Sequence, residues 1–199
     1  MKLLVGTGNK GKLLEITEKF GELPIELKSL KDFPEILQPE ETGRTFAENA
    51  ILKARWYSTQ TGLWTLADDS GLEVEALGGL PGVISARYAG VGAKDEDNIR
   101  KLLDELKNER NRSARFVCSM AVSDEKGILR FLAEGVCDGI IAFKPRGKNG
   151  FGYDSVFIPK GFDKTFGELS SLVKQKISHR ARALQKIISF FSDFIGNKT

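Results

Sequence analysis

The sequence predicts a mixed α/β fold, in which helices pack around a sheet in one or two lobes. Strand-like and helical segments alternate early in its 199 residues, and a meander of strands occupies the middle. This order is typical of a mixed sheet, because each amphipathic helix buries its apolar side against a sheet face. The length is sufficient for a substantial core in one domain or two closely joined lobes.

The first half is expected to alternate between strands and helices. Apolar spacing predicts a strand at 2–5, a helix at 12–20 and a second strand near 25–30. The next helix begins at a capping box formed by Thr45 and Glu48, and Gly62 ends it. A short buried strand at 64–67 and an alternating, half-exposed strand at 72–77 are expected to follow.

The second half predicts a hairpin and a final helix. A glycine-rich, irregular stretch at 78–92 leads to a helix that Asp95 can cap. Strands are expected at 114–122 and 128–134, joined by a turn at 124–127, then at 136–142 and 156–158, with a last helix from about 178. A basic, glycine-rich loop occupies 144–152.

Two adjacent carboxylates, Asp68 and Asp69, follow the strand at 64–67, and we expect the chain to turn at Gly71. In open α/β sheets, ligands bind at the carboxyl ends of strands. Side chains alternate on an extended backbone, so the two aspartates are not expected to point into the core together. A divalent metal or an arginine is the usual partner of such a pair, and an ordinary Asx turn is the alternative.

The loop at 7–12 joins a strand to a helix and has the features of an anion site. Gly8 and Gly11 let the backbone approach a ligand, and free amides at the helix start favour an anion. Lys10 and Lys12 place positive charge against the helix dipole, which a bound phosphate would turn to advantage. A glycine turn with exposed lysines is the alternative.

Positive charge that opposes the helix dipole also occurs at the start of the last helix. Ser178 resembles an N-cap, and His179, Arg180 and Arg182 fill the first turn. Lys174 could add to the same positive field. His179 is the only histidine of the chain, and a packing or surface role is the alternative to a functional one.

A third cluster lies in the loop before the strand at 156–158. Phe151 stands between glycines, so its ring either stacks on a flat ligand such as a base or plugs the core. Glu40 and Glu41, in the polar loop before the capped helix, are either metal ligands or solvated loop charges. Lys53, on that helix, could point toward the same site.

Composition and charge disfavour several classes of protein. The net charge of +3 is too small to indicate a nucleic-acid or membrane partner. Cys118 and Cys137 lie in strand-like runs, where buried free thiols are expected instead of a disulfide framework or a zinc site. No signal-peptide pattern and no run of membrane-spanning length occurs, which predicts a cytoplasmic protein.

These clusters offer carboxylates for magnesium, cations for phosphates and an aromatic face for a base, a set that fits a nucleoside triphosphate. Together they resemble the inosine triphosphate pyrophosphatase family, in family order and across nearly the full chain. The motifs are 7–12, 40–43 (EETG), 46–54 (FAENAILKA), 67–72 (ADDSGL), 81–90 (PGVISARYAG), 150–154 (GFGYD) and 178–180 (SHR).

The resemblance implies an enzyme that hydrolyses inosine, deoxyinosine and xanthosine triphosphates to the monophosphate and pyrophosphate, which keeps these nucleotides out of DNA and RNA. It implies a single domain over residues 1–199, with two lobes around a long curved sheet and the nucleotide in the cleft between them. It also implies a homodimer and a requirement for Mg²⁺.

The resemblance also assigns roles by position. Asp69 would be the general base or water-orienting carboxylate, and the metal ligands would be Glu41, Asp68 and Asp69, with Glu40. The phosphates or sugar would contact Thr7, Asn9, Lys12, Lys53 and Ser70. Phe151 would stack on the base, and its polar edge would be read by Asp154, Lys174, His179 and Arg180. The remaining expected substrate-site residues are Gly8, Lys10, Gly11, Gly152 and Tyr153.

Base selectivity is expected to depend on the six position of the purine. Hypoxanthine and xanthine carry an oxygen acceptor there, whereas adenine carries an amino group that would leave the donor Arg180 unpaired. Two other functions stay open: a general nucleotide phosphatase that releases orthophosphate from ATP, and a regulator that binds nucleotides without turnover. The doubled aspartate disfavours the regulator. A nucleic-acid binder fits least, because the basic residues gather at two helix starts.

Overall fold

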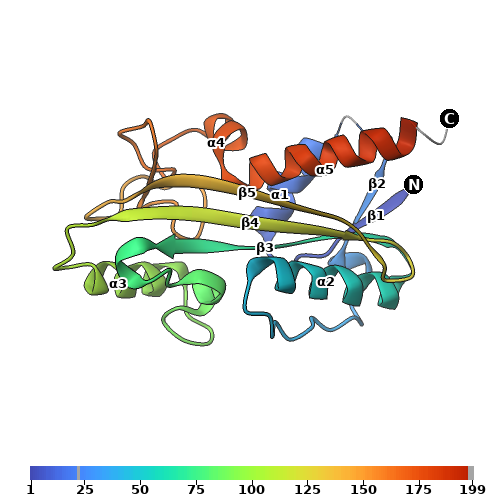
Figure 1. Cartoon of the computed structure of the whole chain (residues 1–199), viewed down its shortest axis with the longest axis horizontal. Helices are drawn as coiled ribbons and strands as arrows, with labels where there is room; N and C mark the ends of the chain where they lie inside the picture. The colour runs from blue at the N-terminus through green and yellow to red at the C-terminus, as the bar shows by residue number, and fades with distance from the viewer. Residues whose placement is uncertain (22, 197–199) are drawn as a thin grey trace. The chain divides into compact units, whose positions relative to one another are not determined.

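The computed structural model describes residues 1–21 and 23–196, and within them six strands form one sheet. The strands are Lys2–Val5 (β1), Glu26–Ser29 (β2), Trp64–Val74 (β3), Ser113–Ser123 (β4), Leu129–Ile141 (β5) and Phe157–Pro159 (β6). Their order in the sheet is β2-β1-β3-β4-β5-β6 (Figure 1). β1 runs parallel to both β2 and β3, whereas β5 and β6 are antiparallel.

Helices separate most of the strands. The α-helices are Lys10–Phe20 (α1), Phe46–Thr61 (α2), Asp95–Glu105 (α3), Ser171–Ile177 (α4) and His179–Gly196 (α5), and the 3₁₀ helices are Leu30–Asp32 (η1), Glu75–Leu77 (η2) and Gly82–Arg87 (η3). The predicted fold class, a mixed α/β sheet with helices around it, is confirmed. None of the helices in the described part of the chain has the length and hydropathy needed to cross a membrane.

Three elements differ from the predictions. β3 is continuous through Gly71, so the turn predicted there is wrong and the strand predicted at 72–77 is the end of β3 followed by η2. β5 likewise includes most of the separate strand predicted at 136–142. α4 was not predicted, because its seven residues contain too few apolar repeats to reveal a helical period.

One compact unit consists of residues 1–69, 118–135 and those from 180 onward. On one face of its strands, Ile16 and Phe20 of α1 share an apolar core with Leu184 and Phe191 of α5. On the other face α2 packs closely through alanines, namely Ala50 and Ala54 against Ala67 and Ala121. Figure 1 shows α2 on the opposite side of these strands from α1 and α5, so β3 is covered on both faces in this unit.

The second compact unit consists of residues 70–117 and 136–179. Its core is largely aromatic, and the rings of Phe116 and Phe157 lie 4.5 Å apart between centroids. Tyr153 is buried in this core, and its hydroxyl donates to the carbonyl of Ser85 at 2.8 Å. That bond ties the glycine-rich loop at 150–154 to η3.

Candidate active site

The two aspartates lie in the middle of β3, just past the end of its parallel neighbour. β1 pairs with β3 as far as Leu66, whose carbonyl accepts the amide of Gly6 at 2.8 Å. Asp68 and Asp69 therefore follow the carboxyl end of β1, although they do not stand at the end of their own strand. The backbone there is extended, which rules out an Asx turn as the explanation of the pair.

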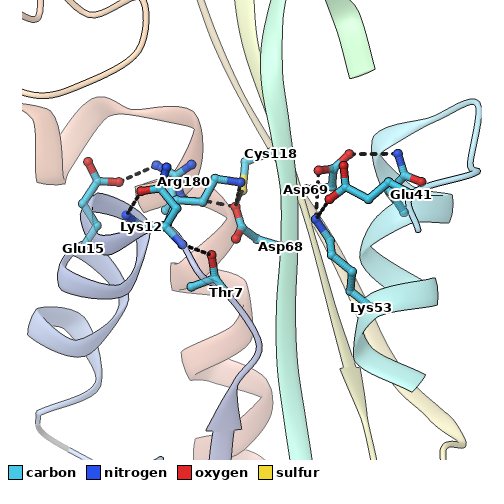
Figure 2. Close-up of polar contacts among 11 residues, drawn as sticks. Thr7, Lys12, Glu15, Glu41, Lys53, Asp68, Asp69, Cys118 and Arg180 are labelled. Carbon is cyan, nitrogen blue, oxygen red and sulfur yellow. Dashed lines mark hydrogen bonds and ion pairs between the residues drawn. The ribbon is translucent and has the colours of Figure 1, made fainter. Parts of the chain in front are cut away.

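Asp68 and Asp69 point to opposite faces of the sheet, as alternation along a strand requires (Figure 2). Asp68 points toward α1 and α5, and Asp69 points toward α2. Both are nevertheless buried, with 1% and 6% exposure, because helices cover both faces of β3 in this unit. Each carboxylate must therefore find its own partners on its own face.

On the α2 face, Asp69 shares one ammonium group with Glu41. Lys53 Nζ lies 3.0 Å from Asp69 Oδ1 and 2.7 Å from Glu41 Oε1. Asn49 Nδ2 donates to the other Asp69 oxygen at 3.2 Å. Burial raises the pKa of Asp69 above its usual value, although the charge of Lys53 opposes this. The face thus holds two carboxylates and one lysine.

The local sequence explains why α2 can present these groups. The predicted capping box is present, since Thr45 Oγ1 accepts from the amide of Glu48 at 3.1 Å. Gly62 ends α2 in the left-handed conformation, as predicted. Asn49 and Lys53 are four residues apart and lie on the same side of the helix, which is the side that meets β3.

On the opposite face, Asp68 is held by two cations. Its Oδ2 lies 3.0 Å from Lys12 Nζ and 3.5 Å from Arg180 Nε, and Arg180 Nη1 binds Glu15 Oε2 at 2.5 Å. Burial by itself would raise the pKa of Asp68, but the charges of Lys12 and Arg180 outweigh it and hold the pKa well below its usual range. The thiol of Cys118 also points at this carboxylate, 3.9 Å away, and burial raises the pKa of that thiol to about 12.

The carboxylates that could hold a metal are therefore divided between the two faces. Among the described residues, no group of three or more His, Cys, Asp or Glu side chains is placed to hold one metal ion. Glu41 and Asp69 do converge on a single cation, the ammonium of Lys53. That pair fits Mg²⁺, which binds proteins through one or two carboxylates and completes its shell with water and phosphate. Glu40 is exposed in the loop before α2.

The loop at 7–12 forms the capped start of α1. Asn9 is the N-cap, and its Oδ1 accepts from the amide of Lys12 at 3.0 Å. Thr7 Oγ1 in turn accepts from the amide of Asn9 at 3.3 Å. Gly8 and Lys10 are exposed, Gly11 is partly exposed, and no acidic residue occupies the first turn. The exposed, positively charged helix start that the sequence predicts is present.

A separate cluster in the second unit is built around a buried ion pair. Lys174 Nζ of α4 lies 2.6 Å from Asp154 Oδ2, which also accepts from the amide of Phe151 at 2.9 Å. The same ammonium lies 4.5 Å from the centroid of the half-buried Phe151 ring. Gly150 has φ of +78°, and a Cβ there would lie 2.0 Å from Asp154 Oδ2, so this position requires glycine.

Other residues of this unit that the sequence predicts for the site contact neighbouring residues of the fold. The amide of Gly152 donates to Asp95 Oδ2 at 2.6 Å, and Lys94, not Asp95, is the N-cap of α3. His179 is buried and stacks on Phe116, with 4.7 Å between ring centroids. Ser70 is half-buried on β3, next to Asp69 in sequence but assigned to this unit.

The structure thus gathers the predicted site residues into two clusters, one in each unit. Glu15, Asn49 and Asp95 were not predicted as site residues, and they bind Arg180, Asp69 and Gly152 respectively. Asn49 lies inside the motif at 46–54, so its motif position could have revealed it. Glu15 and Asp95 carry no such local signal, because their partners are far away in the sequence.

Comparison with known proteins gives a consistent result over most of the chain. The sequence model of the Ham1 family matches residues 3–190. A dITP/XTP pyrophosphatase of Elusimicrobium minutum is 50% identical over 193 residues, covering 94% of this chain and 98% of the relative. A dITP/XTP pyrophosphatase of Bacillus anthracis is 49% identical over 190 residues, covering 94% of each.

A solved structure supports the same relationship. The HAM1 protein of Coxiella burnetii superposes with a TM-score of 0.90 at 41% sequence identity, covering 97% of this chain and 99% of that one. The similarity includes both units, because so little of either chain is left out. On the evidence of sequence and structure together, this chain belongs to the Ham1 family.

Proposed function

We propose that this chain is a nucleoside-triphosphate pyrophosphatase, which hydrolyses ITP, dITP and XTP to the monophosphate and pyrophosphate. The observation that carries the proposal is the cluster on the α2 face, where Asp69 and Glu41 converge on Lys53. Two carboxylates and one lysine can position a metal, a phosphate chain and a water together. The names of the relatives at about half identity favour this substrate class.

The proposed cofactor is Mg²⁺, held by Asp69 and Glu41. When bound, Mg²⁺ would neutralise charge on the phosphate oxygens and fix their position. Asp69 would also orient the attacking water, and its raised pKa makes it a better proton acceptor than an ordinary aspartate. Of the four metal ligands predicted from sequence, Glu40 is exposed and Asp68 faces away from Lys53, so we assign neither to the metal.

The residues of α1 and its preceding loop would bind the phosphates. Lys12 and the amides at the helix start offer positive charge, and Lys53 offers more from α2. Thr7, Asn9 and Ser70 stay proposed contacts of the phosphates or sugar. Such groups lower the barrier mainly by positioning the phosphate chain and stabilising its charge.

The Asp154–Lys174 pair is suited to the polar edge of a deaminated purine. Lys174 can donate to the oxygen at the six position, and Asp154 can accept from the protonated N1 beside it. Adenine offers the opposite pattern at both positions, so neither charged group would gain a hydrogen bond from it. Arg180, also proposed as a base reader, has its guanidinium bound to Glu15 and Asp68, which makes Lys174 the better placed donor. Phe151 would supply the stacking face.

The experiment that tests this function measures pyrophosphate and orthophosphate release with Mg²⁺ from inosine, xanthosine, adenosine and guanosine triphosphates. We expect pyrophosphate from the first two and little from the others. Orthophosphate from all four would contradict the proposal in favour of a general phosphatase, and no release from any would leave a binding protein. A homodimer and a cytoplasmic location stay proposals that follow the family resemblance, and light scattering after gel filtration tests the first.

A further inference from the structure

We infer that Asp68 is a positioning residue that acts through Lys12 from the far face of β3, and that it is not a ligand of the metal. The inference rests on the proposed function, because it assigns different roles in one active site to two adjacent aspartates: Asp69 binds the metal and Asp68 positions Lys12. Figure 2 shows the basis: β3 separates Asp68 from the Asp69–Glu41–Lys53 cluster.

The first step is the direction of the carboxylate. Successive side chains of a strand point to opposite faces, and β3 is extended on both sides of this pair. For Asp68 to reach a metal held by Asp69 and Glu41, the strand would have to twist out of its pairing with the rest of the sheet. The burial of Asp68, at 1% exposure beneath α1 and α5, opposes such a movement.

The second step is the difference in access between Asp68 and Lys12. The side chain of Asp68 is fully buried, whereas that of Lys12 retains 16% exposure on the first turn of α1. A phosphate arriving at this helix start can therefore reach the side chain of Lys12 but not the carboxylate of Asp68. The 3.0 Å ion pair fixes where that ammonium lies before a ligand binds, which reduces the entropy lost on binding.

The third step is the balance of charge on this face. Lys12 and Arg180 supply two positive charges, and Asp68 and Glu15 supply two negative charges. Arg180 and Lys12 both approach Oδ2 of Asp68, and Glu15 binds the guanidinium of Arg180, so this oxygen is held beside Lys12.

The test compares Asp68→Asn, Lys12→Met, the double variant and Asp69→Asn. Mn²⁺ affinity is measured by electron paramagnetic resonance without nucleotide, and kcat and KM are measured for dITP with Mg²⁺. We expect Asp68→Asn to keep Mn²⁺ affinity within about twofold. Asp69→Asn should lose about 10-fold or more, because even the partners that orient metal ligands contribute about 10- to 100-fold to metal affinity. Asp68→Asn and Lys12→Met should each raise KM about tenfold, while Asp69→Asn should lower kcat.

The double variant identifies the route of the effect. If Asp68 acts through Lys12, Asp68→Asn adds little to KM in the Lys12→Met background, because the interaction it supports is already gone. Additive effects would overturn the inference, and so would a loss of Mn²⁺ affinity in Asp68→Asn equal to that in Asp69→Asn. If the Asp68→Asn protein does not fold, the double variant with Lys12→Met takes its place, because it removes one charge of each sign. Its Mn²⁺ affinity then shows whether Asp68 binds the metal.

The outcome is separable from that of the proposed function. Pyrophosphate release from dITP by the unmodified chain is measured first, and its absence would contradict the proposed function alone. The Mn²⁺ affinities of the four variants would still show whether Asp68 or Asp69 holds the metal.

Discussion

The two faces of β3 each present one aspartate, Asp68 on one face and Asp69 on the other, and the two carboxylates have different surroundings. On the α2 face, the carboxylates of Asp69 and Glu41 converge on the ammonium of Lys53. On the other face, Asp68 and Glu15 are matched by Lys12 and Arg180. The difference teaches that the helix covering a carboxylate decides its chemistry: two carboxylates that converge on one point can bind a cation, and a carboxylate held by a lysine and an arginine fixes the positions of those neighbours.

The largest expected effect comes from removing the carboxylate of Asp69 on the α2 face. Asp69→Asn should lower kcat for dITP by about 10³-fold, a typical loss when a group that orients or deprotonates the nucleophile is removed. The free energy of unfolding should stay equal or rise, because a buried carboxylate with a raised pKa is lost. Pyrophosphate release and urea denaturation measure the two quantities.

Asp124→Asn is the matched control for this variant. Asp124 is another buried aspartate of the same unit, ion-paired to Arg130 Nη2 at 2.5 Å at the hairpin between β4 and β5. The Asp124→Asn protein should have a lower free energy of unfolding than the unmodified chain and the same kcat for dITP. An Asp69→Asn protein that turns over dITP at the normal rate would remove Asp69 from the chemistry.

The balanced face should show the opposite pattern, with stability affected most. Asp68→Asn leaves the buried Arg180 and the partly exposed Lys12 facing one carboxylate, and breaking a buried ion pair in this way costs about 3–5 kcal/mol. Urea denaturation of the variant, with Asp69→Asn as the comparison, measures the change. Equal stability of the two variants would contradict the difference between the faces.

Much of this arrangement could be predicted from local sequence, and the reasons are physical. The capping box at Thr45 and the left-handed Gly62 define both ends of α2, because caps depend only on neighbouring residues. Helix-start charge likewise indicated Lys12 and Lys10. The grouping of Asp69, Glu41 and Lys53 came from motifs that resemble one family.

The rest depends on contacts that local sequence does not contain. Gly71 is a turn signal by itself, yet pairing with neighbouring strands keeps β3 extended through it, so the aspartates lie mid-strand. Arg180 and Glu15 are 165 residues apart, and nothing in either segment indicates their ion pair. The apolar periodicity of the seven-residue helix α4 is too short to predict which way its residue Lys174 faces.

A smaller effect is expected in the second unit, where the charged pair should govern substrate choice. Asp154→Asn keeps the shape but removes the charge that holds Lys174 and would accept from the purine N1. The ratio of kcat/KM for dITP over dATP should fall about 10- to 100-fold, the cost of one charged hydrogen bond. An unchanged ratio with normal folding would remove the Asp154–Lys174 pair from base recognition.

The smallest effect is the pH dependence of stability in metal-free buffer, which should differ in sign between the faces. The pKa of Asp68 is lowered in the fold, so its contribution is present above the unfolded value of about 3.9 and is lost as the pH falls through the folded pKa. The pKa of Asp69 is raised, so its contribution is present below about 3.9 and is lost as the pH rises through the folded pKa.

Urea denaturation at a series of pH values checks this prediction with the two asparagine variants. The free energy of unfolding of Asp68→Asn should approach that of the unmodified chain toward acid pH. The free energy of unfolding of Asp69→Asn should increase relative to that of the unmodified chain as the pH rises. Parallel curves for the two variants would contradict the opposite shifts.

The most direct test of the division between the faces is a crystal structure with Mn²⁺ and a non-hydrolysable dITP analogue, in which anomalous scattering locates the metal. We predict an anomalous peak at the carboxylates of Asp69 and Glu41, with Asp68 still bound to Lys12 on the other side of β3. A peak coordinated by Asp68 would contradict the account.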